Sequence, residues 1–276
     1  MLRIVTANVN GIRAAQRRGG VDWLASAQPD VICLQEVRAS AEQLAESLEG
    51  SELAAYSCSY AESSDKGRAG VAVLSRTAPK SVRIGLGVQE FAEAGRWIEV
   101  DLDTPTGLIT VISTYVHTGE ATDQPRQDQK YRFLDGMHDR MAALARRSAR
   151  GKGEAVLTGD LNIAHTEQDI KNWKGNRGKA GFLEQERAYL DRWRDELGWV
   201  DLGRVHGGTG PGPYTWWSWR GRGFDTDGGW RIDYVMSTTR LAKQAAGVEV
   251  GKAAAYAERW SDHAPVTAMF EHPGLG

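Results

Sequence analysis

The stretch Ala155-Val156-Leu157-Thr158-Gly159-Asp160-Leu161-Asn162 is a short apolar run that ends in glycine and then places an acid and an amide two residues apart. If the run is a strand, Asp160 and Asn162 point to the same side at its carboxyl end. An accepting carboxylate beside a donating amide suits the activation of water next to a developing oxyanion. A Gly-Asp pair after a strand is also an ordinary turn, so this stretch alone does not indicate a site.

Three other strand-like runs also carry acids or polar groups. They are Val31-Ile32-Cys33-Leu34-Gln35-Glu36, Trp230-Arg231-Ile232-Asp233-Tyr234 and Ser261-Asp262-His263-Ala264-Pro265-Val266. The complete set of strand-end groups is Asn8, Glu36, Tyr115, Asp160, Asn162, Asp233, Asp262 and His263. These groups are dispersed from one terminus to the other, so they converge only if the fold brings them to one rim of the sheets.

Hydrophobic patterning predicts the remaining elements. Residues 96–103 alternate cleanly and indicate a half-buried strand, and residues 108–115 are expected to pair with it across the turn at 104–107. Helical spacing of leucine and methionine after Pro125 predicts one long amphipathic helix that ends near Gly151, with its apolar stripe in the core. Other strands are predicted at 2–9, 214–219, 231–237, 247–250 and 266–270. Further helices are predicted at 12–27 and around the apolar stripe formed by Leu190, Trp193 and Leu197, and a loop is predicted at 171–181.

The predicted architecture is therefore α/β, with two packed β-sheets flanked by helices in one domain spanning residues 1–276. Apolar residues make up 41% and charged residues 25%, as in ordinary globular proteins. No stretch has the length and apolarity of a membrane span or the pattern of a signal peptide, so we expect a cytoplasmic protein with no membrane association. The near-neutral charge and the lack of an obvious apolar interface stripe make a monomer the default expectation, with no obligate protein partner. Cys33 and Cys58 lie in strand-like runs and are expected to be buried, reduced thiols.

The net charge of −2 excludes a protein coated in positive charge, but it leaves room for a local basic face. Residues 171–179 carry four basic side chains and no acid, and Arg220, Arg222 and Arg231 surround a tryptophan-rich segment. Basic groups mixed with aromatic rings suit a phosphate backbone and its exposed bases. Solvated loop charges are the alternative interpretation.

The ligand types favour a hard divalent cation. Oxygen ligands without a cysteine cluster, and one histidine beside an acid, indicate Mg²⁺ or Mn²⁺ and are not typical of zinc. Glu36 is the expected chief ligand, and Asp262 is expected to orient and hold a protonated His263 that would bind a phosphate oxygen. The histidines without metal-ligand spacing are interpreted as structural or surface groups: His117, His138, His165, His206 and His272.

Each of these residues has a plainer interpretation when taken singly. Glu36 could be a surface carboxylate, Tyr115 a capping aromatic, Asp233 the partner of Arg231, and Asp262 a turn former. Jointly, a metal ligand, an activating carboxylate, an oxyanion donor and an Asp-His couple predict metal-assisted phosphodiester hydrolysis.

Six motifs resemble a known family, and they occur in family order over nearly the whole chain. They are Asn8-Val9-Asn10-Gly11-Ile12-Arg13, Leu34-Gln35-Glu36, Gly70-Val71, Gly159-Asp160-Leu161-Asn162-Ile163-Ala164, Arg231-Ile232-Asp233-Tyr234 and Ser261-Asp262-His263-Ala264-Pro265-Val266. The chain resembles the exonuclease III type of apurinic/apyrimidinic endonuclease, in the endonuclease/exonuclease/phosphatase superfamily. That resemblance implies a four-layered α/β sandwich with two packed mixed β-sheets.

The resemblance also implies how DNA is bound. Residues 172–182 look like the DNA-contacting loop of these enzymes, and residues 214–233 look like the region that shapes their abasic pocket. Carried over, Trp216, Trp230 and Ile232 would line an apolar slot for the base-free sugar; a tryptophan-rich strand packed into the core is the alternative. The implied DNA contacts are Arg13, Arg38, Lys174, Asn176, Arg177, Arg220 and Arg222.

Three positions depart from the family pattern. Ala7 stands where an aromatic residue is usual, and Val37-Arg38 where Thr-Lys is frequent, although Arg38 keeps the charge. Asn10 stands where some members have Asp, which leaves the metal site with one fewer carboxylate and puts a second metal ion in doubt.

The implied activity is that of a Mg²⁺-dependent DNA repair nuclease acting on double-stranded DNA. It would hydrolyse the phosphodiester 5′ to an abasic site, leave a 3′-hydroxyl, and trim 3′ ends as a 3′ to 5′ exodeoxyribonuclease. Glu36 would hold the metal, with Asn10 or Asp262 contributing through water; Asp160, oriented by Asn8, would activate the attacking water. Asn162, His263 and the metal would stabilise charge on the phosphoryl oxygens, and Tyr115 would contact the phosphate or aid the leaving group. Asp233 would support the site by hydrogen bonding to its neighbours. Whether Asp160 or His263 is the general base is left open.

Two rival functions use the same residues. A phosphoinositide or sphingomyelin phosphodiesterase of the same superfamily would apply the same chemistry to lipid headgroups. The other rival is a catalytically silent binder of DNA damage, which would be expected to lack Glu36, Asp160 or His263; all three are present.

Overall fold

The computed structural model describes residues 1–275 and has two mixed six-stranded β-sheets packed face to face. The first sheet has the order β11-β12-β1-β2-β4-β3, and the second has the order β5-β6-β7-β8-β10-β9. The strands of the first sheet are β1 (Leu2–Asn8), β2 (Val31–Gln35), β3 (Ser57–Ala61), β4 (Val71–Ser75), β11 (Ala245–Val250) and β12 (Val266–Phe270). Those of the second are β5 (Ser81–Ile84), β6 (Trp97–Thr104), β7 (Gly107–Tyr115), β8 (Glu154–Asp160), β9 (Trp199–Asp201) and β10 (Asp233–Thr238).

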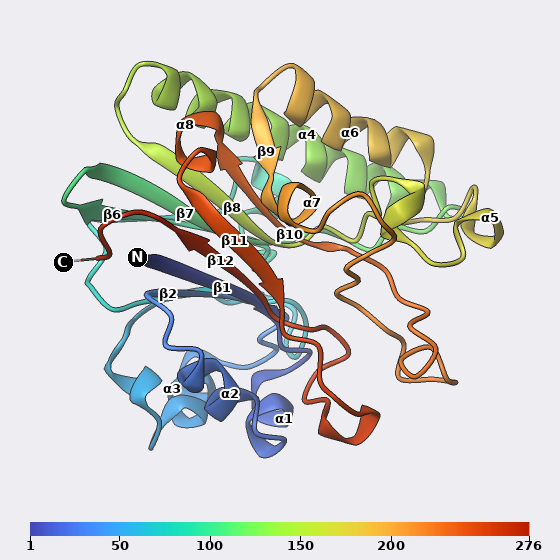
Figure 1. Ribbon diagram of the computed structural model, residues 1–276, viewed down its shortest axis with the longest axis horizontal. Coiled ribbons are helices and arrows are strands. Elements are labelled where there is room, and N and C mark those ends of the chain that lie inside the picture. The colour runs from blue at the N-terminus through green and yellow to red at the C-terminus, as the bar shows by residue number, and fades with distance from the viewer. Residues whose placement is uncertain (276) are drawn as a thin grey trace.

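Helices cover the outer face of each sheet, which makes four layers (Figure 1). Beneath the first sheet lie α1 (Ile12–Arg17), α2 (Gly20–Ser26) and α3 (Ala41–Leu48). Above the second lie α4 (Gln124–Ala149) and α6 (Glu184–Asp195). The short helices α5 (Trp173–Asn176), α7 (Leu202–His206) and α8 (Thr239–Ala242) fall between strands. The predicted four-layered α/β sandwich is confirmed.

Burial on both faces explains the continuous apolar strands. In β1, Leu2 and Ile4 join the core between the sheets, whereas Val5 and Ala7 pack against the helices beneath. Strands covered on both faces carry unbroken apolar runs because neither face meets water. The stripe of α4, including Met137 and Met141, packs on the second sheet as expected.

Several predicted elements match the structure closely, and others were wrong. The pairing of β6 with β7 and the bounds of β12 are confirmed. The helix expected over 12–27 is interrupted, because the chain turns through Arg18 and a left-handed Gly19 between α1 and α2. The strand expected at 214–219 is absent from residues 1–275; only single bridges join Trp216 to Trp230 and to His263. The expected loop at 171–181 contains the one-turn helix α5.

The two cysteines are both free, but they differ in environment. Cys33 is buried in β2 as expected, whereas Cys58 is exposed because it lies on β3, an edge strand of its sheet. Across residues 1–275, none of the helices combines the length and the apolarity needed to cross a membrane.

Candidate active site

The sheet topology places the strand-end groups at one rim of the sandwich. β1 runs parallel to β2, and β7 runs parallel to β8, so the carboxyl ends of each pair lie together. Asn8 ends β1, Glu36 follows β2, Tyr115 ends β7 and Asp160 ends β8. The antiparallel strand β10 begins at the same rim, where Asp233 lies directly opposite Asp160.

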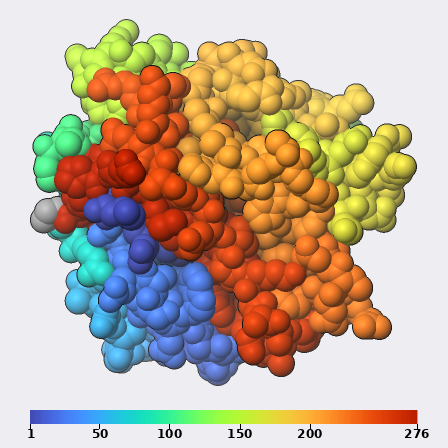
Figure 2. Space-filling view, viewed as in Figure 1, coloured from blue at the N-terminus to red at the C-terminus, as the bar shows by residue number. Residues whose placement is uncertain are grey.

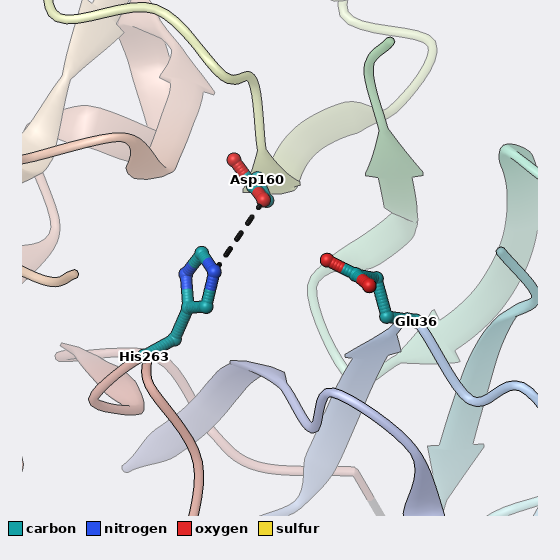
Figure 3. A group of neighbouring side chains, drawn as sticks. All are labelled: Glu36, Asp160 and His263. Atoms are coloured by element: carbon teal, nitrogen blue, oxygen red, sulfur yellow. Dashed lines mark ion pairs between the residues drawn. The ribbon is translucent and has the colours of Figure 1, made fainter. Parts of the chain in front are cut away.

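Asn8 joins the two sheets at this rim. Its side-chain amide donates to Glu36 Oε1 at 2.7 Å and to Asp160 Oδ2 at 3.0 Å. Both carboxylates are buried, with Glu36 6% and Asp160 1% exposed. In Figure 3 the side chains of Glu36, Asp160 and His263 point toward one another, and one ligand atom from each lies within 4.8 Å of the others.

The partner of His263 differs from the sequence expectation. His263 Nδ1 donates to Asp233 Oδ2 at 2.8 Å, and Thr215 Oγ1 donates to the same oxygen at 2.6 Å. Asp262, which was expected to hold the ring, instead accepts hydrogen bonds from Asn10 Nδ2 at 2.7 Å and Trp216 Nε1 at 3.2 Å. That expectation was wrong because neighbouring residues of the chain point in different directions, whereas Asp233 reaches His263 from β10.

The charges around His263 favour its protonated form. Burial alone would lower the pKa of His263, but the carboxylates of Asp233 and Asp160 outweigh it and raise this pKa to about 10. His263 Nε2 lies 3.8 Å from Asp160 Oδ2. The imidazole is therefore a cation at neutral pH that faces the Asp160 carboxylate.

Asp160 is shifted in the direction typical of an acid or base catalyst. Burial raises the pKa of Asp160 to about 7; His263 counteracts this shift, and the Asp233 and Glu36 carboxylates add to it. Burial and the neighbouring carboxylates of Glu36 and Asp160 keep the pKa of Tyr115 far above its ordinary range, so this phenol stays protonated.

Asn162 is held at the edge of the site in a left-handed backbone conformation, with φ of 51°. Its backbone N–H donates to Asp160 Oδ1 at 2.8 Å, and its side-chain amide donates to the carbonyl of Val116 at 2.9 Å. Left-handed φ values are uncommon outside glycine but are tolerated by Asn. The amide therefore has a fixed position beside the carboxylate.

A cavity of about 350 Å³ opens directly over these groups. One wall is polar and includes Glu36, Asp160 and His263, and the other is apolar. The apolar wall consists of Trp216, Trp230 and Ile232, with the two indole rings edge to face at a centroid distance of 6.2 Å and an interplanar angle of 89°. The structure thus places the three predicted pocket residues next to the candidate catalytic groups.

Known proteins share both the fold and the sequence over nearly the whole chain. Residues 5–263 match the model of the Endonuclease/Exonuclease/phosphatase family. The chain belongs to this family. It is 32% identical to an exodeoxyribonuclease of Bacillus subtilis, covering 96% of this chain and 98% of that protein. It is 31% identical to exodeoxyribonuclease III of Haemophilus influenzae, covering 98% and 100%.

Solved structures of similar proteins agree with the fold. An AP endonuclease from Archaeoglobus fulgidus superposes with a TM-score of 0.82 at 27% identity, covering 98% of this chain and 100% of that one. A 3′ phosphatase from Neisseria, bound to a product DNA hairpin, superposes with a TM-score of 0.82 at 28% identity, covering 98% and 100%.

The acidic cluster of this family member could hold a metal ion. Glu36, Asp160 and His263 form the group with suitable spacing, and two of the three ligands are carboxylates. Asp233 Oδ1 is buried and has no hydrogen-bond partner within the described residues. Arg38 is the cation in direct contact with Glu36. Oxygen-rich, carboxylate-dominated sites fit hard divalent cations such as Mg²⁺ and Mn²⁺.

The basic residues expected to contact DNA lie on exposed segments around the cavity. Lys174, Asn176 and Arg177 belong to α5 and its carboxyl end, where the Arg177 guanidinium stacks 4.3 Å from the Trp173 ring centroid. Arg220 and Arg222 lie on the exposed turn between Trp219 and Phe224. Figure 2 shows this turn (orange) and α5 (yellow) projecting at the same end of the molecule. Arg13 is exposed on α1, and Arg38 lines the cavity.

Arg231 does not belong to this basic face, contrary to its sequence interpretation. Its side chain is 2% exposed and binds Asp169 and Asp201, each at 2.7 Å. It is therefore unavailable to a phosphate, and the alternative pairing of Arg231 with Asp233 is also wrong.

Two further residues at the site were missed from the sequence. The Arg96 guanidinium lies 4.5 Å from the centroid of the Tyr115 ring and donates to the Tyr115 carbonyl at 3.1 Å. Thr215 donates to Asp233 and accepts from the backbone N–H of Asp233. Arg96 stands directly before β6 and carries no motif of its own, whereas Thr215 lies inside residues 214–233, the region that the family resemblance implies for the pocket.

Proposed function

We propose that this protein is a divalent-metal-dependent DNA repair nuclease that cleaves the phosphodiester 5′ to an abasic site and also trims 3′ ends. The observation that carries the proposal is the two-sided cavity, in which an apolar slot adjoins a buried carboxylate-histidine cluster. A sugar without a base fits an apolar slot beside the scissile phosphate, whereas a nucleotide whose base is paired within the duplex does not enter it. The named activities of the relatives, exodeoxyribonuclease and AP endonuclease, support the same assignment.

Asp160 is the proposed general base. With a pKa raised to about 7 it is both partly deprotonated and basic enough to take a proton from water near neutral pH. His263, with a pKa raised to about 10, already carries its proton and is poorly suited to that role. We assign His263 to binding a phosphoryl oxygen, and Asp233 to holding the imidazolium in the required orientation.

The other roles follow from position. Asn162 donates an amide hydrogen toward the oxyanion, Tyr115 contacts the phosphate with its protonated phenol, and Asn8 orients the Asp160 carboxylate. Such fixed donors act in a water-poor site without reorganisation, and one donor is worth roughly 10² to 10³ in rate. Glu36 is the proposed chief ligand of the cation. Asp262, which accepts from Asn10 and lines the same cavity, is a further candidate together with Asn10. When bound, Mg²⁺ would neutralise charge developing on the phosphoryl oxygens.

A duplex with a single abasic analogue tests this proposal. Incubated with Mg²⁺, the wild-type protein should nick the strand 5′ to the analogue, and a chelator should abolish the nick. The matched substrate is the same duplex with an intact nucleotide at that position, which should be cut only from its 3′ end. Binding of the duplex without cleavage would favour a silent damage binder, and hydrolysis confined to phosphoinositides would overturn the nuclease assignment.

A further inference from the structure

Lys130 and Glu186 form an ion pair in the interior, behind the candidate site. Lys130 Nζ lies 2.7 Å from Glu186 Oε1, and both side chains are 0% exposed. Lys130 belongs to α4 and Glu186 to the first turn of α6. A buried ion pair is weak support for stability by itself, because taking two charges out of water offsets their attraction. The position of this pair therefore calls for a specific explanation.

The Lys130 ammonium joins the two segments that leave the sheet at the active site. Besides Glu186, it donates to the carbonyl of Thr118 at 3.1 Å and to the carbonyl of Asn162 at 3.0 Å. These three bonds use all three N–H donors of the ammonium. Thr118 lies three residues after Tyr115, and Asn162 lies two residues after Asp160. One cation thus ties together the chain beyond β7 and the chain beyond β8.

Glu186 holds that ammonium in place, and other hydrogen bonds fix the Glu186 carboxylate. Its carboxylate also accepts from Gln127 Nε2 at 2.9 Å and from the backbone N–H of Leu183 at 3.1 Å. The packing around the pair is tight at Gly119, where a Cβ atom would lie 2.5 Å from Gln127 Oε1 and 2.9 Å from Lys130 Cδ. Hydrogen bonds and close packing thus fix the positions of both the ammonium and the carboxylate.

Asn162 is the residue that this arrangement fixes most directly. Its backbone N–H is bound by Asp160, its side-chain amide by the Val116 carbonyl, and its own carbonyl by Lys130. Asn tolerates a positive φ better than most residues but at a cost in energy, so these bonds help to hold the conformation. If the bond to the carbonyl is lost, the peptide after Asn162 can rotate, and the side-chain amide moves with it.

We propose that Lys130 is a positioning residue for hydrolysis, because its ammonium fixes the Asn162 backbone and so aims the Asn162 amide at the reacting phosphate. This inference rests on the proposed role of Asn162. Lys130 is not among the residues that line the cavity, so it acts through Asn162 and touches no substrate. Other contacts already join α4 to α6: the Tyr131 ring stacks on the Tyr189 ring with centroids 6.3 Å apart, and the Tyr189 hydroxyl donates to Asp135 at 2.6 Å. The helices therefore do not need an ion pair for packing.

The test is the double variant K130M/E186Q. It removes both charges together, so no unpaired charge is left in the interior, and Gln keeps one acceptor for the groups around position 186. On the abasic duplex we expect kcat to fall about 10- to 100-fold with KM little changed, as small displacements of a positioned group do. An unchanged kcat in a variant that melts like the wild type overturns the proposal.

A second ion pair on the same helix provides the matched control. Arg140 in α4 binds Glu99 of β6 at 2.6 Å, and the other polar partners of Glu99 are Trp97 and Arg83, not the segments after β7 and β8. R140M/E99Q should change thermal stability to a similar extent yet leave kcat near the wild-type value. An equal loss of kcat in both double variants would mean that general destabilisation explains the effect, and the proposal would be wrong.

Coupling to Asn162 gives a readout that a purely structural role would not move. In an Asn162→Ala background, K130M/E186Q should lower kcat by no more than about threefold, because residues acting through one another are not additive. A full additional 10- to 100-fold loss would show that Lys130 does not act through the Asn162 amide.

Hydrogen exchange separates this inference from the proposed function. K130M/E186Q should speed amide exchange in residues 161–183, and the control pair should not. If the wild-type protein fails to cut abasic DNA, the proposed function is overturned, while unchanged exchange in K130M/E186Q would overturn the positioning role by itself. If that variant does not fold, Lys130→Arg replaces it: the charge is kept, but a planar guanidinium cannot supply the same three donors, and the same fall in kcat is expected.

Discussion

Two buried charge clusters meet at the start of β10, and they are built on opposite principles. Arg231, just before the strand, binds Asp169 and Asp201, and Arg204 also contacts Asp169, so two cations face two carboxylates. Asp233, the first residue of the strand, belongs to the active-site cluster with Glu36, Asp160 and His263. There the carboxylates outnumber the cations.

The same residue type responds in opposite directions in the two clusters. Burial alone would raise the pKa of Asp169, but Arg231 and Arg204 outweigh it and lower this pKa to about 2. Asp160 is also buried, and its pKa is raised to about 7, since Asp233 and Glu36 reinforce the effect of burial, and His263 and the Asn162 N–H oppose it without outweighing it. Burial does not decide the sign of the shift; the local balance of charge does.

The difference separates a structural cluster from a functional one. In the Arg231 cluster the carboxylate of Asp169 is fully bonded: Thr166 N–H donates to Oδ2 at 2.8 Å and Arg231 Nε donates to Oδ1 at 2.7 Å. The active-site cluster has three carboxylates against the two cations His263 and Arg38, and Asp233 Oδ1 is buried without a hydrogen-bond partner among the described residues. Unbalanced charge in a cavity is the arrangement expected where a cation and a substrate complete the set.

Asp160→Asn should give the largest effect, and it should be confined to catalysis. Loss of the base should lower kcat on the abasic duplex roughly 10²- to 10⁴-fold. Removing one charge from a cluster with excess negative charge relieves repulsion, so the melting temperature should stay the same or rise. Calorimetry and single-turnover kinetics on the same preparation measure both quantities.

Binding measurements make the same variant more informative. Asp160→Asn should retain affinity for DNA and for Mg²⁺, because Glu36 is the chief ligand in our proposal. A large loss of Mg²⁺ affinity would instead make Asp160 a ligand, and a clear fall in melting temperature would contradict the distinction between the two clusters.

Asp169→Asn should give the converse result. It leaves the Arg231 guanidinium buried without its full charge partner, and breaking a buried pair in this way lowers the free energy of unfolding by roughly 3 to 5 kcal/mol. The folded fraction should keep a kcat close to the wild-type value, because Asp169 is not in the cavity. Urea unfolding measures the loss.

The exposed Asp195→Asn variant, which breaks a surface pair with Arg194, is the control and should unfold like the wild type. A fall in kcat as large as that of Asp160→Asn would show that the Arg231 cluster also serves the chemistry.

The sequence predicted the layers and the rim because both depend on repeating patterns. Apolar runs such as 155–158 identify strands buried on both faces, and their polar ends identify where parallel strands stop. The strand expected at 214–219 was wrong because aromatic residues that line a cavity have the same composition as a strand. Trp216 makes only isolated bridges there.

The partners within each cluster could not be predicted, since they depend on register and depth. Asp233 and His263 are 30 residues apart and meet through the fold, whereas Asp262, adjacent in the chain, points away to Asn10 and Trp216. Lys130 and Arg231 have no sequence feature that distinguishes a buried cation from a solvated one. Burial of a charge becomes visible only when its partner is known.

The smallest expected effect is a difference in acid stability that isolates the balanced cluster. Asp169 has a folded-state pKa of about 2 against an ordinary value of 3.8. A depressed pKa contributes stability that is fully present above the unfolded value and is lost as the pH falls through the folded value, here between about pH 4 and pH 2. Each tenfold difference in proton affinity between the folded and unfolded states is worth about 1.4 kcal/mol, so this contribution is about 2 kcal/mol.

The free energy of unfolding of the wild type, measured by urea titration at a series of pH values, should fall by this amount more than that of Asp169→Asn over the same interval. Parallel pH profiles for the two proteins would mean that Asp169 titrates normally, and the contrast between a balanced and an unbalanced cluster would then rest on the active site alone.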